Sequence, residues 1–224
     1  MTEKTKRLVM STMGVLIAGF SVGILKRAEL GVDPFQAFMS GLDFAVPLKF
    51  GTLYVLLSLI LLTFSFIADK HYIGPGTFVT LLFQGYVIDF SRKFFYGLFP
   101  VLSLPGRVLF LMIGICILCL ASSLYITANL GVSTYDAISL IIAYTWKKGK
   151  FKYNRIITDL VCVCLGSALY LASGGKLSGL AAMVGAGTII TAFFMGPLID
   201  FLNIHVSRPV LASGMAKGKN YERG

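Results

Sequence analysis

Long apolar segments alternate with short polar stretches along the whole of this 224-residue chain. Each segment is close to the ~20 residues that a helix needs to cross the hydrocarbon core of a bilayer. None shows the strict apolar–polar alternation of membrane-barrel strands. Because backbone in lipid must satisfy its hydrogen bonds internally, the pattern predicts an all-α polytopic membrane protein. The segments cover residues 8–25, 51–68, 72–90, 108–128, 156–173 and 177–202.

Composition supports this class, since 56% of the residues are hydrophobic and only 13% are charged. A soluble domain has about a quarter of its residues charged. The N-terminal stretch MTEKTKR and the apolar run after it have the form of a signal peptide. No small-residue cleavage site precedes Lys26, however, and we expect a retained first span.

The net charge of +10 does not indicate nucleic-acid binding, because the cations lie between the apolar segments. This is where the positive-inside rule places them, and contact with lipid headgroups explains them. We therefore expect a lipid bilayer and no nucleic acid as partner, with both termini cytoplasmic. The sequence makes no prediction of oligomeric state.

Two pairs of similar segments indicate an internal duplication. GPGTFVTLLFQGYVIDF at 74–90 and GAGTIITAFFMGPLIDF at 185–201 match at nine of seventeen positions. ELGVDPFQAF at 29–38 similarly matches NLGVSTYDAI at 129–138. We predict two tandem repeats, 1–103 and 104–208, each with three long helices and one short broken helix. Residues 209–224 are polar and are expected to form a disordered tail.

The number of crossings depends on two short apolar stretches, 33–48 and 133–146. If both cross the membrane, there are eight crossings and the halves are parallel; if both are re-entrant, there are six and the halves are inverted. Eight crossings place 16 Lys and Arg residues inside and 4 outside, and six crossings place 13 inside and 7 outside. The positive-inside rule therefore favours eight, with six as the alternative.

The LGV motifs carry matched polar residues beside a helix break. Gly31 tolerates unusual dihedral angles, and Pro34 removes a backbone donor. Asp33 and its counterpart Ser133 are predicted N-caps and candidate ligand contacts. The pairs Glu29 and Asn129, and Gln36 and Asp136, are further candidates for binding a substrate or ion. Of these, Asp136 is the strongest, because an ionisable group at membrane depth costs ~2.5–3.5 kcal/mol.

The GxGT motifs are interpreted first as close helix packing and second as cavity lining. Paired glycines let neighbouring backbones approach, and the hydroxyl groups of Thr77 and Thr188 can bond within or between helices. Asp89 and Asp200 end these helices, where the dipole disfavours negative charge. They are candidates for an ion-coupling site, a hydrogen bond between halves, or plain solvated acids.

Acidic residues predominate among the ionisable groups near the membrane, with Arg155 as the main counter-charge. Arg155 and Asp159 are four residues apart and are expected to pair on one helix face. This balance favours a cationic, zwitterionic or proton-coupled solute. The repeat with broken helices is typical of transporters, and we predict a small-solute transporter or permease. The alternative is a non-transporting accessory or assembly protein, in which the motifs only pack helices.

No catalytic motif supports an enzyme. The chain lacks HExxH, and its GxGT motifs lack the GK[ST] ending of a P-loop. The four cysteines lie in apolar segments and the two histidines in loops, so we expect neither a metal nor a cofactor.

The motifs LGVDPFQAF, GVSTYDAISL and VGAGTIITAFFMGPLIDF resemble those of the bacterial YczE/YyaS/YitT-type integral membrane proteins. The resemblance covers residues 8–205 and implies a location in the bacterial plasma membrane. It implies no particular substrate or catalytic residue. The first half departs from the motif at Tyr86, where the second half has Pro197.

Overall fold

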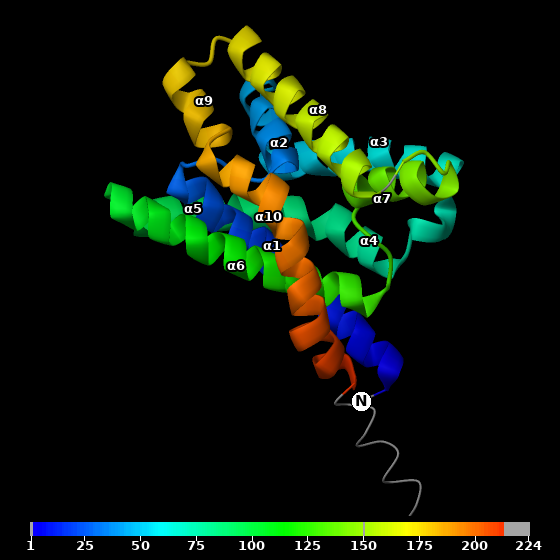
Figure 1. Cartoon of the computed structure of the whole chain (residues 1–224). Coiled ribbons are helices and arrows are strands. Elements are labelled where there is room, and N and C mark those ends of the chain that lie inside the picture. Colours follow the sequence, from blue (N-terminus) through cyan, green and yellow to red (C-terminus); the bar gives the residue numbers. More distant parts are fainter. Residues whose placement is uncertain (1, 150, 213–224) are drawn as a thin grey trace, which may run out of the picture.

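The computed structural model describes residues 2–149 and 151–212, and these residues form helices and loops without a strand (Figure 1). The chain runs through α1 (Glu3–Ala28), α2 (Pro34–Ala45), α3 (Phe50–Ala68), α4 (Pro75–Val79), α5 (Gly85–Leu98), α6 (Leu104–Ala128), α7 (Thr134–Leu140), α8 (Phe151–Ala172), α9 (Leu177–Met183) and α10 (Ala186–Leu202). A 3-10 turn covers Lys70–Tyr72, and π-helical turns cover Thr80–Gln84, Ile141–Thr145 and Asn203–Ser207. The first π-helical turn joins α4 to α5 without a break.

Five helical segments are long and apolar enough to span a bilayer: Glu3–Ala28, Phe50–Ala68, Leu104–Ala128, Tyr153–Ala172 and Leu177–Ala212. Large apolar side chains such as Ile60, Ile67 and Phe194 are exposed on these segments. Such a surface is stable in lipid and unfavourable in water. The chain is therefore a multi-pass helical membrane protein, and the predicted class is confirmed.

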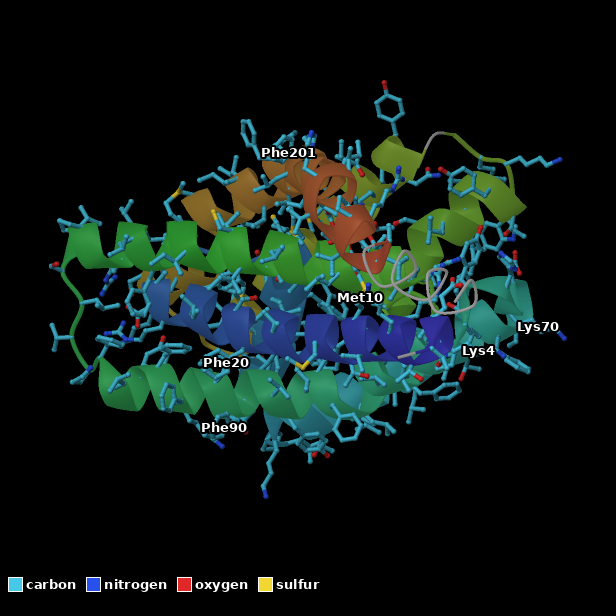
Figure 2. The ribbon with its side chains drawn as sticks, turned by 90° about the horizontal axis from the view of Figure 1, so that it is seen from below. Lys4, Met10, Phe20, Lys70, Phe90 and Phe201 are labelled. Atoms are coloured by element: carbon cyan, nitrogen blue, oxygen red, sulfur yellow. The ribbon has the colours of Figure 1, made fainter. Side chains whose placement is uncertain are left out.

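Helices α1 and α6 lie side by side (Figure 2) and run in opposite directions. A Cβ atom on Gly14 would lie 2.8 Å from the carbonyl oxygen of Ala121, and one on Gly114 would lie 3.4 Å from the backbone nitrogen of Leu25. Glycine thus permits close helix contact at both places. The pairing of an early residue of α1 with a late residue of α6 makes the two helices antiparallel.

Two ends of the molecule follow from this pair. At the Met10 end, Arg7 Nη1 donates to the carbonyl oxygen of Ala128 at 3.1 Å. At the Glu29 end, Arg107 and Glu29 form an ion pair at 3.0 Å. The last described helical residues return to the Met10 end, where Lys6 Nζ donates to the carbonyl oxygen of Leu211 at 2.9 Å.

The α4–α5 helix runs parallel to α1, and α10 runs parallel to α6. Ser91 Oγ donates to the carbonyl oxygen of Phe20 at 3.0 Å, and Tyr96 Oη donates to that of Lys26 at 3.2 Å. On the other side, the hydroxyl groups of Ser123 and Ser207 lie 2.5 Å apart. Helix α4–α5 therefore ends at the Glu29 end, and α6 begins there.

Helices α2 and α7 are too short to cross a bilayer. The 12 residues of α2 span about 18 Å, against a hydrocarbon core of about 30 Å. Helix α2 starts after α1 has reached the Glu29 end, and its Asp43 pairs with Arg92 at 2.9 Å near that same end. Helix α2 therefore returns the chain to the Glu29 end and does not cross to the Met10 end.

The segment from α7 returns to the Met10 end in the same way. After α6 reaches that end, α7 leads to Thr145, whose hydroxyl donates to Asp69 beside the end of α3 at 2.5 Å. This bond and one from the backbone N–H of His71 lower the pKa of Asp69 below its usual value. The eight-crossing prediction is not confirmed, because it places residues 69 and 145 on opposite sides of the membrane. The antiparallel α1 and α6 also fit the six-crossing alternative.

Of the predicted tail, residues 209–212 are helical. Residues 213–224 lie outside the described part of the chain, and the prediction of disorder there remains a prediction.

Single-cysteine labelling distinguishes the two topologies. In a variant without the four native cysteines, we introduce Val101→Cys, His71→Cys or Lys148→Cys, and label from each side of the membrane with an impermeant maleimide. The fold predicts that His71→Cys and Lys148→Cys react from one side and Val101→Cys from the other. Reaction of Val101→Cys and Lys148→Cys from the same side would support eight crossings instead.

Candidate functional site

The two LGV motifs adopt the same backbone conformation. Glu29 and Asn129 end α1 and α6 with φ of 53° and 51°, and Gly31 and Gly131 both have φ of 97°. A left-handed residue after a helix is a common way to satisfy its last carbonyl groups. Accordingly, the N–H of Glu29 donates to the carbonyl oxygen of Lys26 at 3.3 Å. The matched pair Glu29 and Asn129 thus has a shared role in ending the helices.

Asp33 and Ser133 then begin the two short helices as N-caps. The side chain of Asp33 accepts from the N–H of Gln36 at 3.2 Å, and that of Ser133 accepts from the N–H of Asp136 at 3.1 Å. Both have extended backbones with ψ near 150°. The capping interpretation is confirmed. Contact with a ligand stays a prediction for both residues.

Each LGV motif packs against the GxGT motif of the other half. The N–H of Gly76 donates to the carbonyl oxygen of Leu130 at 2.7 Å, and the N–H of Gly187 donates to that of Leu30, also at 2.7 Å. A Cβ atom on Gly31 or Gly131 would lie 2.5 Å from the backbone nitrogen of Gly185 or Gly74, respectively. We call these two crossings the reciprocal seam.

The threonines of the GxGT motifs complete the seam. Thr77 Oγ1 donates to the carbonyl oxygen of Val132 at 2.7 Å, across the halves. Thr188 Oγ1 instead donates to Met183 in its own half at 3.3 Å. Both threonines are buried. This placement supports close packing as the first role of the GxGT motifs. Thr188 also lines a groove of about 250 Å³ with Asp159 and otherwise mainly apolar residues.

The two short helices meet at their N-terminal ends. The rings of Phe35 and Tyr135, which occupy matched positions after the caps, stack with centroids 4.6 Å apart and an angle of 21°. The edge of Tyr54 also meets Phe35, at 5.8 Å. Two helix N-termini, each with a partial positive charge, therefore lie close to each other in the core.

A charged cluster lies beside this meeting point. Arg155 on α8 bonds Asp136 on α7 through Nη1, and its Nε lies 3.3 Å from Asp159. The Arg155 guanidinium also lies 4.5 Å from the ring centroid of Tyr135. Tyr135 Oη in turn donates to Asp159 at 2.5 Å. The predicted pair of Arg155 and Asp159 is present, and Asp136 joins it.

Asp136 has more partners than the sequence pattern indicates. One oxygen accepts from Tyr125 Oη at 2.8 Å and from Ser133 Oγ at 2.6 Å, while the other faces Arg155. These donors compensate the charge of the carboxylate at a depth where an unpaired charge is costly. Asp33 lies within electrostatic range of Arg155 and Asp159. The cluster therefore joins α6, α7 and α8 with the start of α2.

Gln36 occupies the position in α2 that Asp136 occupies in α7, but it has no arginine beside it. Its side chain is 2% exposed, and within the described residues its Oε1 accepts no hydrogen bond. The two polar residues of this matched pair therefore differ in their surroundings.

Asp89 and Asp200 do not share a role. Asp89 pairs with Arg92 at 3.1 Å and with Lys93 at 2.8 Å, so local pairing explains it. Asp200 is exposed, and the described residues include no ion-pair partner for it. The structure does not bring the two acids together.

Arginines neutralise most of the acids that the sequence placed near the membrane. Besides Arg155, these are Arg107 and Arg27 beside Glu29, at 3.0 and 3.7 Å, and Arg92 beside Asp89. Sequence reasoning missed the pairing of Glu29 with Arg107 because the two residues are distant in the chain. The expected acidic cavity is therefore largely charge-balanced.

A polar pocket of about 300 Å³ lies at the Glu29 end, beside the first LGV motif. Its wall includes Lys26, Ser40, Asp43, Arg92 and Tyr96 from the first half. Tyr170, Gly179, Ala182 and Met183 close it from the second half. None of these residues was predicted as a site residue, because they belong to no recognisable motif.

Comparisons with known proteins agree with the fold. A family model described as "Family of unknown function (DUF6198)" matches residues 5–204. The uncharacterized membrane protein YczE of Bacillus subtilis is 22% identical over 190 residues, which cover 84% of this chain and 81% of the relative. Uncharacterized protein YyaS of the same organism is 25% identical over 199 residues, covering 89% and 90%.

An uncharacterized protein of Haemophilus influenzae is 24% identical over 211 residues, covering 93% of this chain and 88% of the relative. No solved structure shows significant similarity to the chain. The predicted resemblance to YczE- and YyaS-type proteins is confirmed.

Substitution of Gly31 tests the reciprocal seam. Gly31→Ala forces a side chain into a left-handed conformation and against the backbone of Gly185. We expect a loss of about 2–4 kcal/mol in stability, seen as a lower Tm of the purified protein in detergent. Gly131→Ala should cost a similar amount. The control Gly97→Ala meets open space and should change stability by at most about 1 kcal/mol. Equal effects of Gly31→Ala and Gly97→Ala would refute the seam.

Removal of Arg155 tests the charged cluster. Arg155→Met leaves Asp136 and Asp159 without their cation, and we expect a loss of about 3–5 kcal/mol. The control Glu3→Gln breaks an exposed ion pair with Arg7 and should cost less than about 1 kcal/mol. Thermal unfolding of the two variants measures the difference. Similar Tm values for both would mean that the cluster does not hold the helices together.

Proposed function

The chain belongs to DUF6198, since the family model covers residues 5–204, and on this premise we propose that it transports a small solute across the bacterial plasma membrane. The proposed architecture has two inverted halves, residues 1–103 and 104–208. Each half has three crossings and one re-entrant short helix, α2 or α7. Both termini face the cytoplasm.

Matched geometry supports the two inverted halves. At an offset of 100 residues, the two halves repeat a left-handed residue after the helix, a glycine with the same φ, and an N-cap residue. The reciprocal seam relates each half to the other in the same manner. Antiparallel α1 and α6 are what an inverted pair requires. Inverted repeats with discontinuous helices are a common plan of secondary transporters.

The cations support the orientation. In the six-crossing count, 13 of the 20 Lys and Arg residues belong to the side of the N-terminus and 7 to the other side. The positive-inside rule then assigns the Met10 end to the cytoplasm. Lys148, which follows the α7 segment, belongs to this end.

One observation carries the proposal of transport: the starts of two re-entrant helices meet beside a charged cluster inside the protein. Non-helical backbone at membrane depth is tolerated only where protein buries it or a cavity is lined by it. Ionisable groups at such depth commonly mark ion or substrate pathways. Asp136, Asp33 and Gln36 are candidate binding residues in the first turns and caps of these helices.

Charge balance narrows the expected solute. Because arginines neutralise Glu29, Asp89 and Asp136, a simple cation gains little attraction from these acids. A zwitterionic or proton-coupled solute fits a site with nearby charges of both signs. Asp33 caps α2 and forms no ion pair with a cation among the described residues. It is therefore the candidate proton carrier.

The alternative is a non-transporting accessory or assembly protein. The tightness of the reciprocal seam favours it, because backbones in contact leave no room for a solute between the LGV and GxGT motifs. Water access discriminates the two functions. Cysteines introduced at Asp136 and Thr188 should react with an impermeant reagent from at least one side in a transporter, and from neither side in a protein with a dry interior.

Uptake into liposomes tests the transport proposal. Purified protein is reconstituted and assayed with amino acids and quaternary amines, with and without a proton gradient. Asp136→Asn keeps the hydrogen-bonding shape but loses the charge that faces Arg155, and should slow uptake about tenfold or more. The control Asp200→Asn changes an exposed acid and should retain full uptake. No uptake of any solute, or equal uptake by both variants, would contradict the proposal.

A further inference from the structure

Lys26 is a buried ammonium group without a carboxylate partner. It lies near the end of α1, its residue is 9% exposed, and it lines the polar pocket at the Glu29 end. Its Nζ donates to Ser40 Oγ at 2.8 Å and lies 4.3 Å from the ring centroid of Phe50. Among the described residues, no carboxylate oxygen lies within 4.0 Å of this nitrogen.

The other charges of the pocket already neutralise one another. Arg92 bonds Asp43 at 2.9 Å and Asp89 at 3.1 Å, and Lys93 completes the set by bonding Asp89 at 2.8 Å. These two cations and two anions cancel. Asp33 also lies within electrostatic range of Lys26 but forms no ion pair with it, so Lys26 remains a cation without a directly bound anion. A buried charge is costly unless it is paired, so this pocket is favourable for an anionic group.

Lys26 also has unused hydrogen-bonding capacity. An ammonium group has three donors, and one of them reaches Ser40. The aromatic ring of Phe50 faces the charge but accepts no conventional hydrogen bond. A ligand oxygen at the open donors would form a charge-assisted bond, which is stronger than a neutral one.

From these observations we infer that the pocket binds the carboxylate group of a small organic solute through Lys26. The volume of about 300 Å³ is at the lower end for small-molecule sites and suits a solute of amino-acid size. Tyr96 and Tyr170 supply aromatic walls.

The site lies between the halves, because Tyr170, Gly179 and Met183 of the second half close it. It is therefore placed at the outer mouth of the proposed solute path, next to Val32 of the first LGV motif. Transport of the bound solute rests on the proposed function, whereas binding at Lys26 does not depend on it.

Ligand-dependent thermal stability tests the site. The full-length protein in detergent is heated with acetate, glycine or leucine, and separately with methylamine or inorganic phosphate, at matched ionic strength. A ligand that binds only the folded state raises Tm with concentration. We expect a rise with at least one of the three carboxylates and none with methylamine. No rise with any carboxylate, or a rise with phosphate alone, would overturn the inference.

Variants assign the effect to Lys26. Lys26→Gln should weaken carboxylate binding about tenfold or more, whereas Lys70→Gln, which removes an exposed cation at the Met10 end, should bind as the wild type does. If Lys26→Gln does not fold, Lys26→Arg keeps the positive charge, so carboxylate binding should persist in that variant. Equal binding by Lys26→Gln and the wild type, or loss of binding in Lys26→Arg, would refute the role of Lys26.

Lipid headgroups are the other source of anions at this depth. The same melts are repeated in nanodiscs of phosphatidylglycerol and of phosphatidylcholine. Stabilisation by phosphatidylglycerol that depends on Lys26, without any effect of carboxylates, would replace a solute site by a lipid site. Carboxylate binding without uptake in liposomes would leave this inference standing and remove the transport proposal, while uptake that is indifferent to Lys26→Gln would do the opposite.

Discussion

The fold depends on how the backbone is satisfied where α1 and α6 break inside the protein. A free N–H or carbonyl group at membrane depth is costly, and each break exposes several. The structure solves this by exchange: the carbonyl groups of Leu30 and Leu130 accept from Gly187 and Gly76 of the opposite half. Glycine is required because any Cβ atom on Gly31 or Gly131 would strike the facing backbone. This contact therefore explains why the LGV and GxGT motifs contain glycine.

The same exchange positions the chemistry. With the breaks held at the seam, the caps Asp33 and Ser133 start α2 and α7 inside the protein, and Phe35 stacks on Tyr135 between them. Asp136 is then placed one turn into α7, within reach of Arg155 on α8. Lys26, in the last turn of α1 before the first break, lies beside a pocket that residues of both halves enclose. Packing and candidate binding sites therefore share one structural cause.

Local features of the sequence predicted much of this arrangement. The helical membrane class, the breaks, the N-caps and the packing role of the glycines all follow from residue type and spacing over a few positions. The number of crossings did not follow, because Lys and Arg counts differ little between the two topologies, whereas the antiparallel contact of Gly14 with Ala121 bears on it directly. The partners of Asp136 and Glu29 were likewise hidden, since Arg155 and Arg107 lie 19 and 78 positions away in the chain.

The antiparallel pairing of α1 and α6 is the claim on which the inverted halves and the reciprocal seam both depend. Oxidative cross-linking in a cysteine-free variant measures it most directly. A Cβ atom on Gly14 would lie 3.1 Å from that of Tyr125, so the two positions are within reach of a disulfide, whose Cβ atoms lie about 3.5–4.5 Å apart. The account predicts a cross-link for Gly14→Cys with Tyr125→Cys and none for Gly14→Cys with Gly114→Cys. The reverse result would mean parallel halves and would contradict it.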